Sequence, residues 1–218
     1  MVRFHAGTPM KDVFEIIGSK SIDKAKLMSL FPVLKQLDEL QFYHPAHAYG
    51  VLDHSIKAAE LVNSDLLKLV LIFHDVGKLT TATKVSHKTD SDKTVTKFPN
   101  HEAESAKIVN DLFKSKMEPK QLARVLKLIE YHDTPLIKAD DTTVMDKFVA
   151  KYGRDFVADL LTVQRADMAT HEQNYYQNKI KPRLDKICHT FENRHLKEVD
   201  KTRVLSESGD EQSVAQEN

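Results

Sequence analysis

Apolar positions recur at helical spacing along most of the chain. The spacing predicts helices over Leu27–Leu40 and from about Ala46 to Val62. The almost wholly apolar stretch Leu66–Phe73 could be a buried strand or a buried helix by periodicity alone, but its leucine content and its helical neighbours favour a helix. We expect Gly77 to end it.

Residues 79–100 have a different pattern, polar and rich in threonine and lysine. Lys84-Val85 and Thr94–Phe98 flank a turn-like Asp90-Ser91-Asp92. Short runs with β-branched residues on both sides of such a turn are typical of a hairpin. The sequence therefore predicts a small β-hairpin here.

Helical spacing returns after Pro99. Asn100, followed by Glu102 and Glu104, has the form of an N-cap with an acidic first turn. Pro119 suits the first position of the next helix. The remaining predictions are a helix end near Thr134-Pro135, a capping arrangement of Thr143 with Asp146, a helical period through Phe156, Leu160 and Val163 after Gly153, and a disordered tail from Ser206.

These patterns predict an all-α fold with a small β-hairpin insertion. The chain has 218 residues, of which 41% are hydrophobic, so it can form one sizeable core. We expect an N-terminal helical segment at 1–43 that packs on the core, a main domain at 44–200 and a disordered polar tail at 201–218.

Composition narrows the range of partners. Lysine and arginine total 32, equal to aspartate and glutamate, so there is no bulk attraction to nucleic acid or anionic lipid. The sequence has no long apolar run and no signal peptide at Met1–Lys11, so we expect a cytoplasmic protein without a membrane partner. The single Cys188 excludes an internal disulfide framework and a cysteine-based zinc knuckle.

Histidine is the unusual component, with 11 residues. Four predicted helices carry one ionisable residue on an apolar, core-facing stripe, where burial is costly unless something binds it. These residues are His54 (with Val51, Ala58 and Leu61), His101 (with Ile108 and Leu112), His132 (with Leu122, Val125 and Ile129) and Asp167 (with Phe156, Leu160 and Val163).

His74-Asp75 ends the most apolar segment, where a helix end with Gly77 would let both side chains turn to one point. A lone histidine on an apolar face is usually a core residue, but one shared metal explains all six positions. Imidazole and carboxylate ligands suit Mn, Fe, Co, Ni or Zn, whereas Mg and Ca prefer oxygen ligands.

The order His54, His74-Asp75-Val76-Gly77-Lys78, Asp167 resembles the H…HD…D signature of the HD superfamily of metal-dependent phosphohydrolases. The stretch from about His44 to His171 is similar to the HD domains of bacterial tRNA nucleotidyltransferases (CCA-adding enzymes). The motifs that carry this narrower similarity are the hairpin ending in Phe98, His101-Glu102, Tyr131-His132-Asp133 and Arg165-Ala166-Asp167.

The departures from related enzymes are informative too. The Gly-rich loop and paired acids of the nucleotidyltransferase head are absent, so the chain resembles a free-standing HD domain and CCA addition is not implied. The Glu-Asp pair that follows HD in alarmone hydrolases is replaced by Val76-Gly77-Lys78, and the second-helix sequence of cyclic-di-GMP enzymes is missing.

The resemblance implies an HD-domain helical bundle with a metal centre. His54, His74, Asp75 and Asp167 would hold one divalent ion, and His101 and His132 a second, with Asp75 bridging. Such a pair of ions (Mn, Fe, Ni, Co or Zn) suits phosphoester hydrolysis, because an ion lowers the pKa of bound water and both neutralise charge in the transition state. Asp75 is therefore counted among the catalytic residues.

Several other residues are candidates for substrate contact or catalysis. Lys78 could hold a phosphate oxygen or stabilise developing charge, or could be only a cation at a helix C-terminus. Arg165 could bind phosphate in a bidentate manner or form a helix-side salt bridge. Lys84 and Lys97 are candidates for substrate contact, in a basic patch on the predicted hairpin with Lys88 and Lys93. His44 and His47, which precede the first ligand, are candidates as well. Glu102 and Asp133 could orient ligand imidazoles.

The leading hypothesis is hydrolysis of a phosphoester in a nucleotide or an RNA terminus, with a 2′,3′-cyclic phosphate or 2′/3′-monophosphate as the family-guided substrate. The alternatives are a small-nucleotide phosphatase and a nucleotide-binding HD module without turnover, which is disfavoured because no ligand position is lost. His5, His87, His171, His189 and His195 show no partner pattern and receive no role. The oligomeric state is not predicted.

Overall fold

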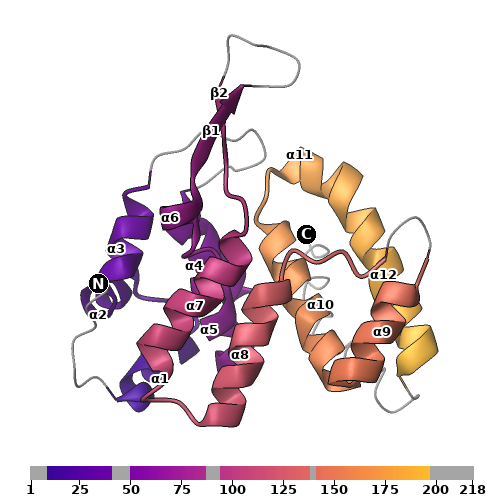
Figure 1. The fold of residues 1–218 in the computed structure, drawn as a ribbon, viewed down its shortest axis with the longest axis horizontal. Coiled ribbons are helices and arrows are strands. Elements are labelled where there is room, and N and C mark those ends of the chain that lie inside the picture. Colours follow the sequence, from indigo (N-terminus) through magenta and orange to yellow (C-terminus); the bar gives the residue numbers. More distant parts are fainter. Residues whose placement is uncertain (1–8, 41–49, 87–93, 138–140, 197–218) are drawn as a thin grey trace, which may run out of the picture.

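The computed structural model describes residues 9–40, 50–86, 94–137 and 141–196. It shows a helical protein with one small antiparallel hairpin that projects from the body (Figure 1), as the sequence predicts. The elements are α1 (Met10–Gly18), α2 (Lys24–Leu30), α3 (Pro32–Asp38), α4 (Val51–Glu60), α5 (Asp65–Phe73), α6 (Lys78–Thr81), β1 (Thr83–Ser86), β2 (Thr94–Lys97), α7 (His101–Phe113), α8 (Pro119–Tyr131), α9 (Thr143–Tyr152), α10 (Arg154–Ala169), α11 (Gln173–Tyr175), the π-helical turn η1 (Tyr176–Ile180) and α12 (Lys181–His195).

Helix α5 lies at the centre of the core, in contact with α1, α4, α8 and α10. All of its residues from Leu67 to Phe73 are buried, which confirms the predicted buried helix. The Ser64 hydroxyl accepts a hydrogen bond from the Leu67 N–H and caps its start. Phe73 packs edge-on against Phe31 and Phe113, with ring centroids 5.1 and 5.5 Å away. The end of α5 is therefore held firmly where His74 and Asp75 follow.

The predicted helix over Leu27–Leu40 is two helices, α2 and α3. The break falls at Phe31, whose backbone is extended (φ −125°, ψ 88°), directly before Pro32 at the first position of α3. Proline has no N–H to donate and its ring disfavours helical geometry in the preceding residue. Apolar spacing alone does not reveal this break, although Pro32 marks it.

Helix α4 begins at Val51, later than the predicted Ala46, and Gly50 before it is extended. Residues 46–49 lie outside the described part of the chain. Leu61, which was predicted to share the buried face of His54, is 54% exposed. The helix ends at Glu60, so helical spacing no longer places Leu61 on that face. The prediction for Leu61 was wrong.

Two predicted helix caps differ in detail. Asn100 precedes α7 but has a left-handed backbone (φ 55°) and its side chain caps nothing. At α9 the cap position is Thr142, one residue earlier than predicted, and its hydroxyl donates to the Asp146 carboxylate at 3.1 Å. The side chain of Asp141 accepts from the Thr143 N–H at 2.8 Å and satisfies the first turn.

The hairpin pairs Thr83 with Lys97 and Lys84 with Thr96. Because directly opposed residues share a face and neighbours alternate, Lys84 and Lys97 lie on opposite faces of the hairpin. The prediction that Lys84 and Lys97 belong to one basic patch was therefore wrong. The predicted turn at 90–92, Lys88, Lys93 and the predicted tail at 201–218 lie outside the described residues.

The two ends of the described chain are helical as well. Lys68 of α5 is buried, and its ammonium donates to the carbonyl of Ser19 at 3.3 Å, just beyond the C-terminus of α1. At the other end α12 packs Ile187, Cys188 and Phe191 against the core.

No helix in the described ranges combines the length and apolar character needed to cross a bilayer.

Candidate metal centre

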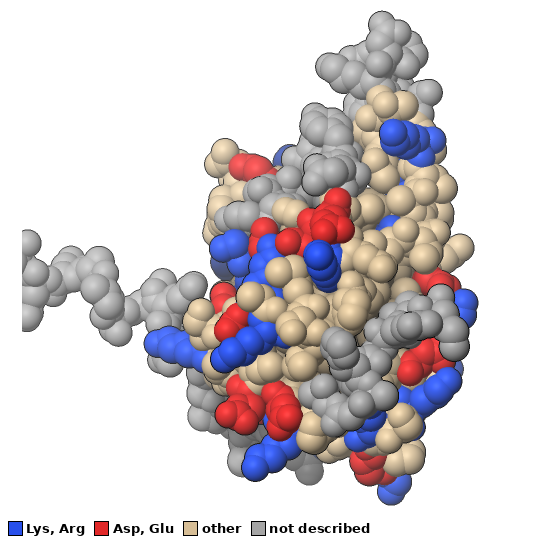
Figure 2. Space-filling view, turned by 90° about the vertical axis from the view of Figure 1, so that its left-hand side faces the viewer, with Lys and Arg blue, Asp and Glu red and all other residues tan. Residues whose placement is uncertain are grey.

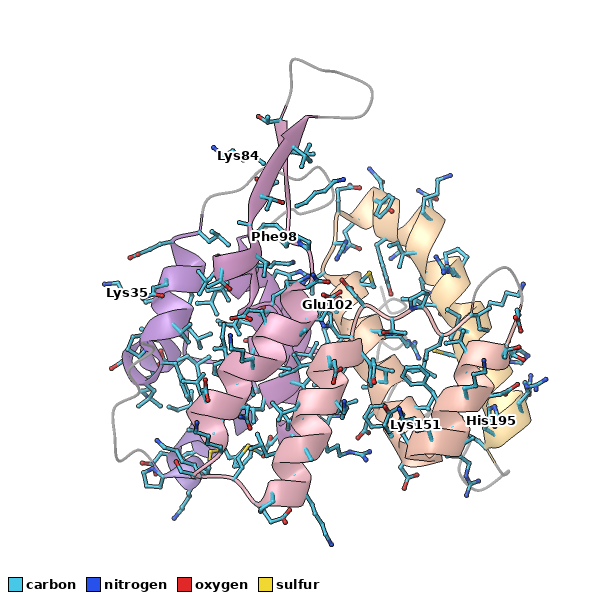
Figure 3. All side chains as sticks on the ribbon, viewed as in Figure 1. Lys35, Lys84, Phe98, Glu102, Lys151 and His195 are labelled. Atoms are coloured by element: carbon cyan, nitrogen blue, oxygen red, sulfur yellow. The ribbon has the colours of Figure 1, made fainter. Side chains whose placement is uncertain are left out.

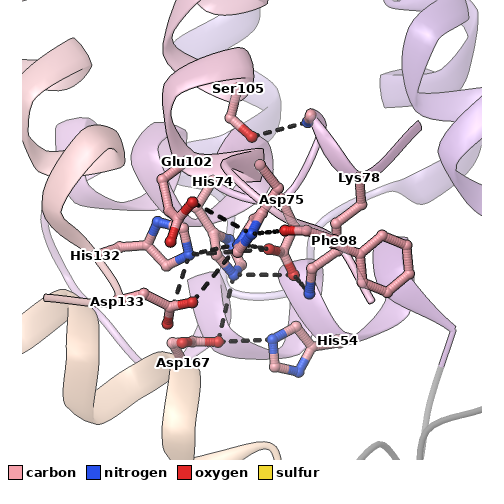
Figure 4. Close-up of polar contacts among 12 residues, drawn as sticks. His54, His74, Asp75, Lys78, Phe98, Glu102, Ser105, His132, Asp133 and Asp167 are labelled. Atoms are coloured by element: carbon pink, nitrogen blue, oxygen red, sulfur yellow. Dashed lines mark hydrogen bonds and ion pairs between the residues drawn. The ribbon is translucent and has the colours of Figure 1, made fainter. Parts of the chain in front are cut away.

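The six predicted ligand residues converge from five helices or helix ends. His54 comes from α4, His74 and Asp75 follow α5, His101 begins α7, His132 follows α8 and Asp167 lies near the end of α10 (Figure 4). All six are buried, none more than 7% exposed. They surround a cavity of about 90 Å³ that most of them line. Burial of this many ionisable groups is costly unless they neutralise one another or bind a cation.

Three of the histidines are oriented by the backbone carbonyl three residues earlier. The Nδ1 atom of His74 lies 2.6 Å from the Leu71 oxygen, that of His132 lies 2.7 Å from the Ile129 oxygen, and that of His101 lies 3.0 Å from the Phe98 oxygen. A carbonyl oxygen can only accept, so each Nδ1 must carry the hydrogen. The neutral imidazole then has a bare Nε2 that can bind a metal.

His54 reaches the same tautomer through Thr170. The Thr170 hydroxyl donates to the Asp167 carbonyl at 2.8 Å, so it accepts from Nδ1 of His54 at 2.7 Å. Nε2 of His54 then faces Oδ1 of Asp167 at 2.7 Å. The four imidazoles thus present the same nitrogen to the cavity.

The ligand atoms form two groups around Asp75. In the first group, Nε2 of His74 lies 3.4 Å from Oδ2 of Asp75 and 3.3 Å from Oδ1 of Asp167, next to His54. In the second, Oδ1 of Asp75 lies 3.2 Å from Nε2 of His101 and 3.9 Å from that of His132. Each of the sets His54, His74, Asp75 and Asp75, His101, His132 is compact enough to hold a metal ion.

Two contacts in the second group place acceptor atoms against one another when both imidazoles are neutral, and a bound cation would stabilise them. Nε2 of His101 and Nε2 of His132 face each other at 3.3 Å, both without a hydrogen in the neutral tautomer. Oδ1 of Asp75 is buried and accepts no hydrogen bond from the described residues. Ligands about 2.1 Å from one ion lie about 3.0–3.4 Å apart, close to the spacing seen. The residues therefore fit a divalent metal.

The charges point to the same conclusion. Burial opposes a proton on His74, but the carboxylates of Asp75 and Asp167 outweigh it and raise the pKa of His74 to about 9. Burial opposes ionisation of Asp75 and Asp167 too, yet His74, helped by Lys78 at Asp75 and by His54 at Asp167, holds both pKa values well below their usual range. Without a metal, a proton on His74 balances the buried carboxylates. A bound cation takes over this role.

The match to a known family agrees with this geometry. A sequence model of the HD domain matches residues 46–171, more than half of the chain. The chain belongs to the HD domain family. HD domains bind divalent metals and are in general metal-dependent phosphohydrolases. A comparison with curated proteins finds no match to the chain. The narrower resemblance to the HD domains of tRNA nucleotidyltransferases stays a prediction.

In this HD domain, Lys78 is part of the buried cluster. Its ammonium donates to Oδ2 of Asp75 at 2.6 Å and lies 5.4 Å from the centre of the Phe98 ring. Lys78 begins the four-residue helix α6, and its ammonium is directed to Asp75. An ammonium has three hydrogens, which leaves donors for a phosphate oxygen at the cavity.

Gly77 has a different role from the one predicted. Its backbone is right-handed helical (φ −66°, ψ −16°), so it does not release the chain from a helix through special geometry. A Cβ atom there would lie 2.3 Å from the His101 carbonyl oxygen and 2.6 Å from the Ser105 nitrogen. The Gly77 N–H also donates to the Ser105 hydroxyl at 2.8 Å. Gly77 therefore lets the HD segment touch α7.

Sequence reasoning missed His171. It lines the cavity with its ring centroid 5.5 Å from that of His54, and it forms a possible ligand set with His54 and Asp167. Burial lowers its pKa. Its position four residues after Asp167 was the available signal. Helix α10 ends at Ala169, so helical spacing does not explain the approach.

Asp133 and Glu102 lie beside the second group. Asp133 lines the cavity, 3.7 Å from Nε2 of His101 and 3.8 Å from that of His132. A carboxylate oxygen of Glu102 lies 3.5 Å from Nδ1 of His101. Glu102 thus lies on the side of the imidazole that carries the hydrogen, as expected of a residue that orients a ligand.

The remaining candidates lie away from the cavity or outside the described residues. Arg165 does not line the cavity and is close enough to Cys188 of α12 to donate a hydrogen bond to its thiol. Lys84 and Lys97 are exposed on the hairpin, where Lys84 projects from the body (Figure 3). His44 and His47 lie outside the described part of the chain.

Proposed function

We propose that the protein hydrolyses a phosphoester of a nucleotide or an RNA terminus, with a 2′,3′-cyclic phosphate or a terminal monophosphate as substrate. The observation that carries this proposal is the position of Asp75. Its two carboxylate oxygens face two separate groups of histidine Nε2 atoms, as expected for a carboxylate shared by two ions.

The two sites would use different residues. His54, His74, Asp75 and Asp167 would hold one ion, and Asp75, His101 and His132 the other, with Mn, Fe, Co, Ni or Zn as the ions that suit imidazole ligands. When bound, such ions provide a hydroxide nucleophile at neutral pH and neutralise charge on the transferring phosphoryl group. No covalent nucleophile is required from the chain.

Residues next to the ligands would position the substrate. Lys78 would hold Asp75 in place and offer its remaining N–H groups to a phosphate oxygen. His171, which is half-buried at the cavity, would contact the same phosphate from the side of His54. Because the ligand residues are buried, little water surrounds these charges and their effect is stronger than at a surface.

Attraction of a polyanion would be local. The face in Figure 2 shows Lys and Arg mixed with Asp and Glu, in line with equal total charges. An RNA end would therefore be attracted by a few cations such as Lys84 or Lys97, whereas a mononucleotide would not extend to the hairpin.

Two alternatives remain as proposals. A small-nucleotide phosphatase is favoured by the small size of the metal cavity, about 90 Å³, and by the distribution of the hairpin lysines over two faces. A nucleotide-binding module without turnover is disfavoured, because all six expected ligand residues are present and converge.

The proposal is tested with purified protein supplied with Mn²⁺, Ni²⁺, Co²⁺ or Zn²⁺ and a panel of mononucleotides, 2′,3′-cyclic nucleotides and short RNAs with phosphorylated ends. We expect hydrolysis that a chelator abolishes and that Asp75→Asn lowers by about 1,000-fold or more. Asp111→Asn is the matched control, since this exposed aspartate of α7 pairs with Lys114 at the molecular surface. If no phosphoester in the panel is hydrolysed with any of these metals, the proposed function is wrong.

A further inference from the structure

A second, larger cavity opens beside the metal centre. Its volume is about 210 Å³, and it shares His132, Asp133 and Met168 with the smaller metal cavity. The rest of its wall comes from the segment after α8, from α10, and from α11, η1 and α12. Much of this wall lies beyond the segment that matches the HD family, which ends at residue 171.

The apolar part of the wall of this cavity suits a flat, apolar ring. Leu136, Leu184 and Ile187 line it and are buried. Tyr175 also lines it and is 46% exposed, so its ring is accessible to a ligand. Exposed aromatic residues beside a phosphate site commonly stack on nucleobases.

Gln164 adds a polar contact to the wall. Its amide nitrogen donates to the Thr134 carbonyl at 2.8 Å, which fixes the orientation of the amide. The side-chain oxygen is therefore left as an acceptor in a residue that lines the cavity. An apolar cavity with a few oriented polar groups is typical of a small-molecule site.

Two cationic side chains line this cavity. Lys179 and Arg183 line it, both exposed, whereas the acidic lining is Asp133 at the metal end. Arg183 donates one N–H to the Ile137 carbonyl at 3.3 Å, which steadies the guanidinium and leaves its other donors. Within the described residues, Lys179 forms no ion pair. These two cations are thus available to an anion.

The π-helical turn η1 positions one of these cations. It carries both Lys179 and Ile180 into the wall of the cavity. A π turn is rare, because it widens the helix and loses regular hydrogen bonds, and such turns are frequent at functional sites. The π-helical geometry of η1 therefore supports a ligand site in the cavity that it lines.

We propose that this cavity binds the nucleoside next to the scissile phosphate, and that Lys179 and Arg183 bind a second phosphate of the same substrate. This inference rests on the proposed function and deepens it. The substrate class is then a nucleotide with phosphates on both sides of one nucleoside, such as a nucleoside 3′,5′-bisphosphate or the phosphorylated 3′ end of an RNA.

The test compares two probes that differ only in the second phosphate. Adenosine 3′-thiophosphate, with and without a 5′-phosphate, is titrated calorimetrically into the metal-loaded protein, the sulfur serving to slow turnover. We expect the 5′-phosphate to tighten binding about tenfold, since an exposed phosphate with two cationic partners gains about this much. Lys179→Gln/Arg183→Gln should remove the gain and leave the affinity for the other probe nearly unchanged.

The control is Lys35→Gln/Lys120→Gln, which removes two charges at exposed positions that do not line the cavity. It should keep the full gain, because the effect depends on the position of the cations. Tyr175→Ala should weaken both probes equally, by about fivefold or more, through the lost stacking. Since the altered residues are exposed, all variants should fold.

Equal affinity for the two probes in the unaltered protein, or a gain that survives Lys179→Gln/Arg183→Gln, would overturn the inference. Failure of both probes to bind would overturn it as well. Binding with the expected pattern but without hydrolysis of any phosphoester would support this cavity while the proposed function fails. Hydrolysis without a gain from the second phosphate would overturn the inference alone.

Discussion

At the scale of single residues, metal binding by the candidate centre depends on which nitrogen of each imidazole carries the hydrogen. His74 and His132 occupy the residue just after a helix. Each uses the carbonyl three residues back as acceptor for Nδ1–H. The same backbone that ends the helix thus orients the ligand, and no further side chain is needed for it.

Lys78 is the residue whose effect on catalysis can be separated from its effect on binding. We expect Lys78→Gln to lower kcat by about 100-fold with little change in KM, because an ammonium beside Asp75 acts on charge that develops in the transition state. Steady-state kinetics on the best substrate of the panel measure both constants. Lys107→Gln, an exposed lysine of α7, is the control. An unchanged kcat in Lys78→Gln would contradict the role.

At the scale of elements, the approach of α6 to α7 places His101 near Asp75. We expect Gly77→Ala to lower the free energy of unfolding by about 1–3 kcal/mol, because its Cβ would overlap the backbone of His101 and Ser105. The variant should also bind less metal, since α7 must shift. Denaturant unfolding and metal analysis measure the two effects.

Gly50→Ala is the matched comparison, because a Cβ at Gly50 meets no atom within 4 Å among the residues that the structure describes. Its backbone angles, φ −61° and ψ 157°, are also open to alanine. This variant should keep both stability and metal content. Equal behaviour of the two variants would show that close packing at Gly77 does not hold the site.

The hairpin offers a second test at this scale, because its lysines lie on opposite faces. We expect only one of Lys84→Gln and Lys97→Gln to raise KM for an RNA end, by about threefold to tenfold, and to flatten its salt dependence. Neither should affect a mononucleotide. Kinetics with both substrates at low and high salt decide this. Equal losses on both substrates would exclude an RNA role for the hairpin.

The sequence predicts elements better than their boundaries and contacts. The buried helix before His74 and the hairpin are foreseen, because leucine content and alternating β-branched residues are local signals. The break at Phe31 was missed although Pro32 marks it locally, and Leu61 is exposed because α4 ends at Glu60. The contact of Gly77 with Ser105 could not be foreseen, because it depends on neighbours distant in the chain. His171 was missed although it lies four residues after Asp167, because α10 ends before it and its approach to His54 depends on the fold.

At the scale of the whole molecule, the buried charges connect stability to pH. The pKa of His74 is raised from 6.5 to about 9, so in the metal-free protein its proton stabilises the fold fully below about pH 6.5. This contribution is lost as pH rises through 9. We expect metal-free protein to lose on the order of 2 kcal/mol between these values, measured by denaturant unfolding.

Two comparisons check the origin of this pH effect. His74→Gln should remove most of the decline, because the titrating group is gone. Saturating metal should reverse it, since metal and proton compete for Nε2 and the metal binds better as pH rises. Metal-free stability that increases from pH 6.5 to 9 would contradict the assigned charges.

The cavity beside the metals is also a property of the whole molecule. Its wall combines the segment after α8 with α10, η1 and α12, which are far apart in sequence. Of these residues, only the candidate metal ligands could be predicted from the sequence, because they are polar residues on otherwise apolar helix faces. Lys179 and Arg183 look like ordinary exposed cations until the fold places them beside Tyr175 and Leu184.

The most direct test of the account is the metal content of the protein, measured by mass spectrometry after saturation with Mn²⁺ or Ni²⁺ and removal of the excess. We predict two ions per chain, about one in His101→Ala or His132→Ala, and nearly none in Asp75→Ala. Wild-type metal content in Asp75→Ala, or a wild type that binds no ion, would contradict the assignment of this cluster as a metal centre.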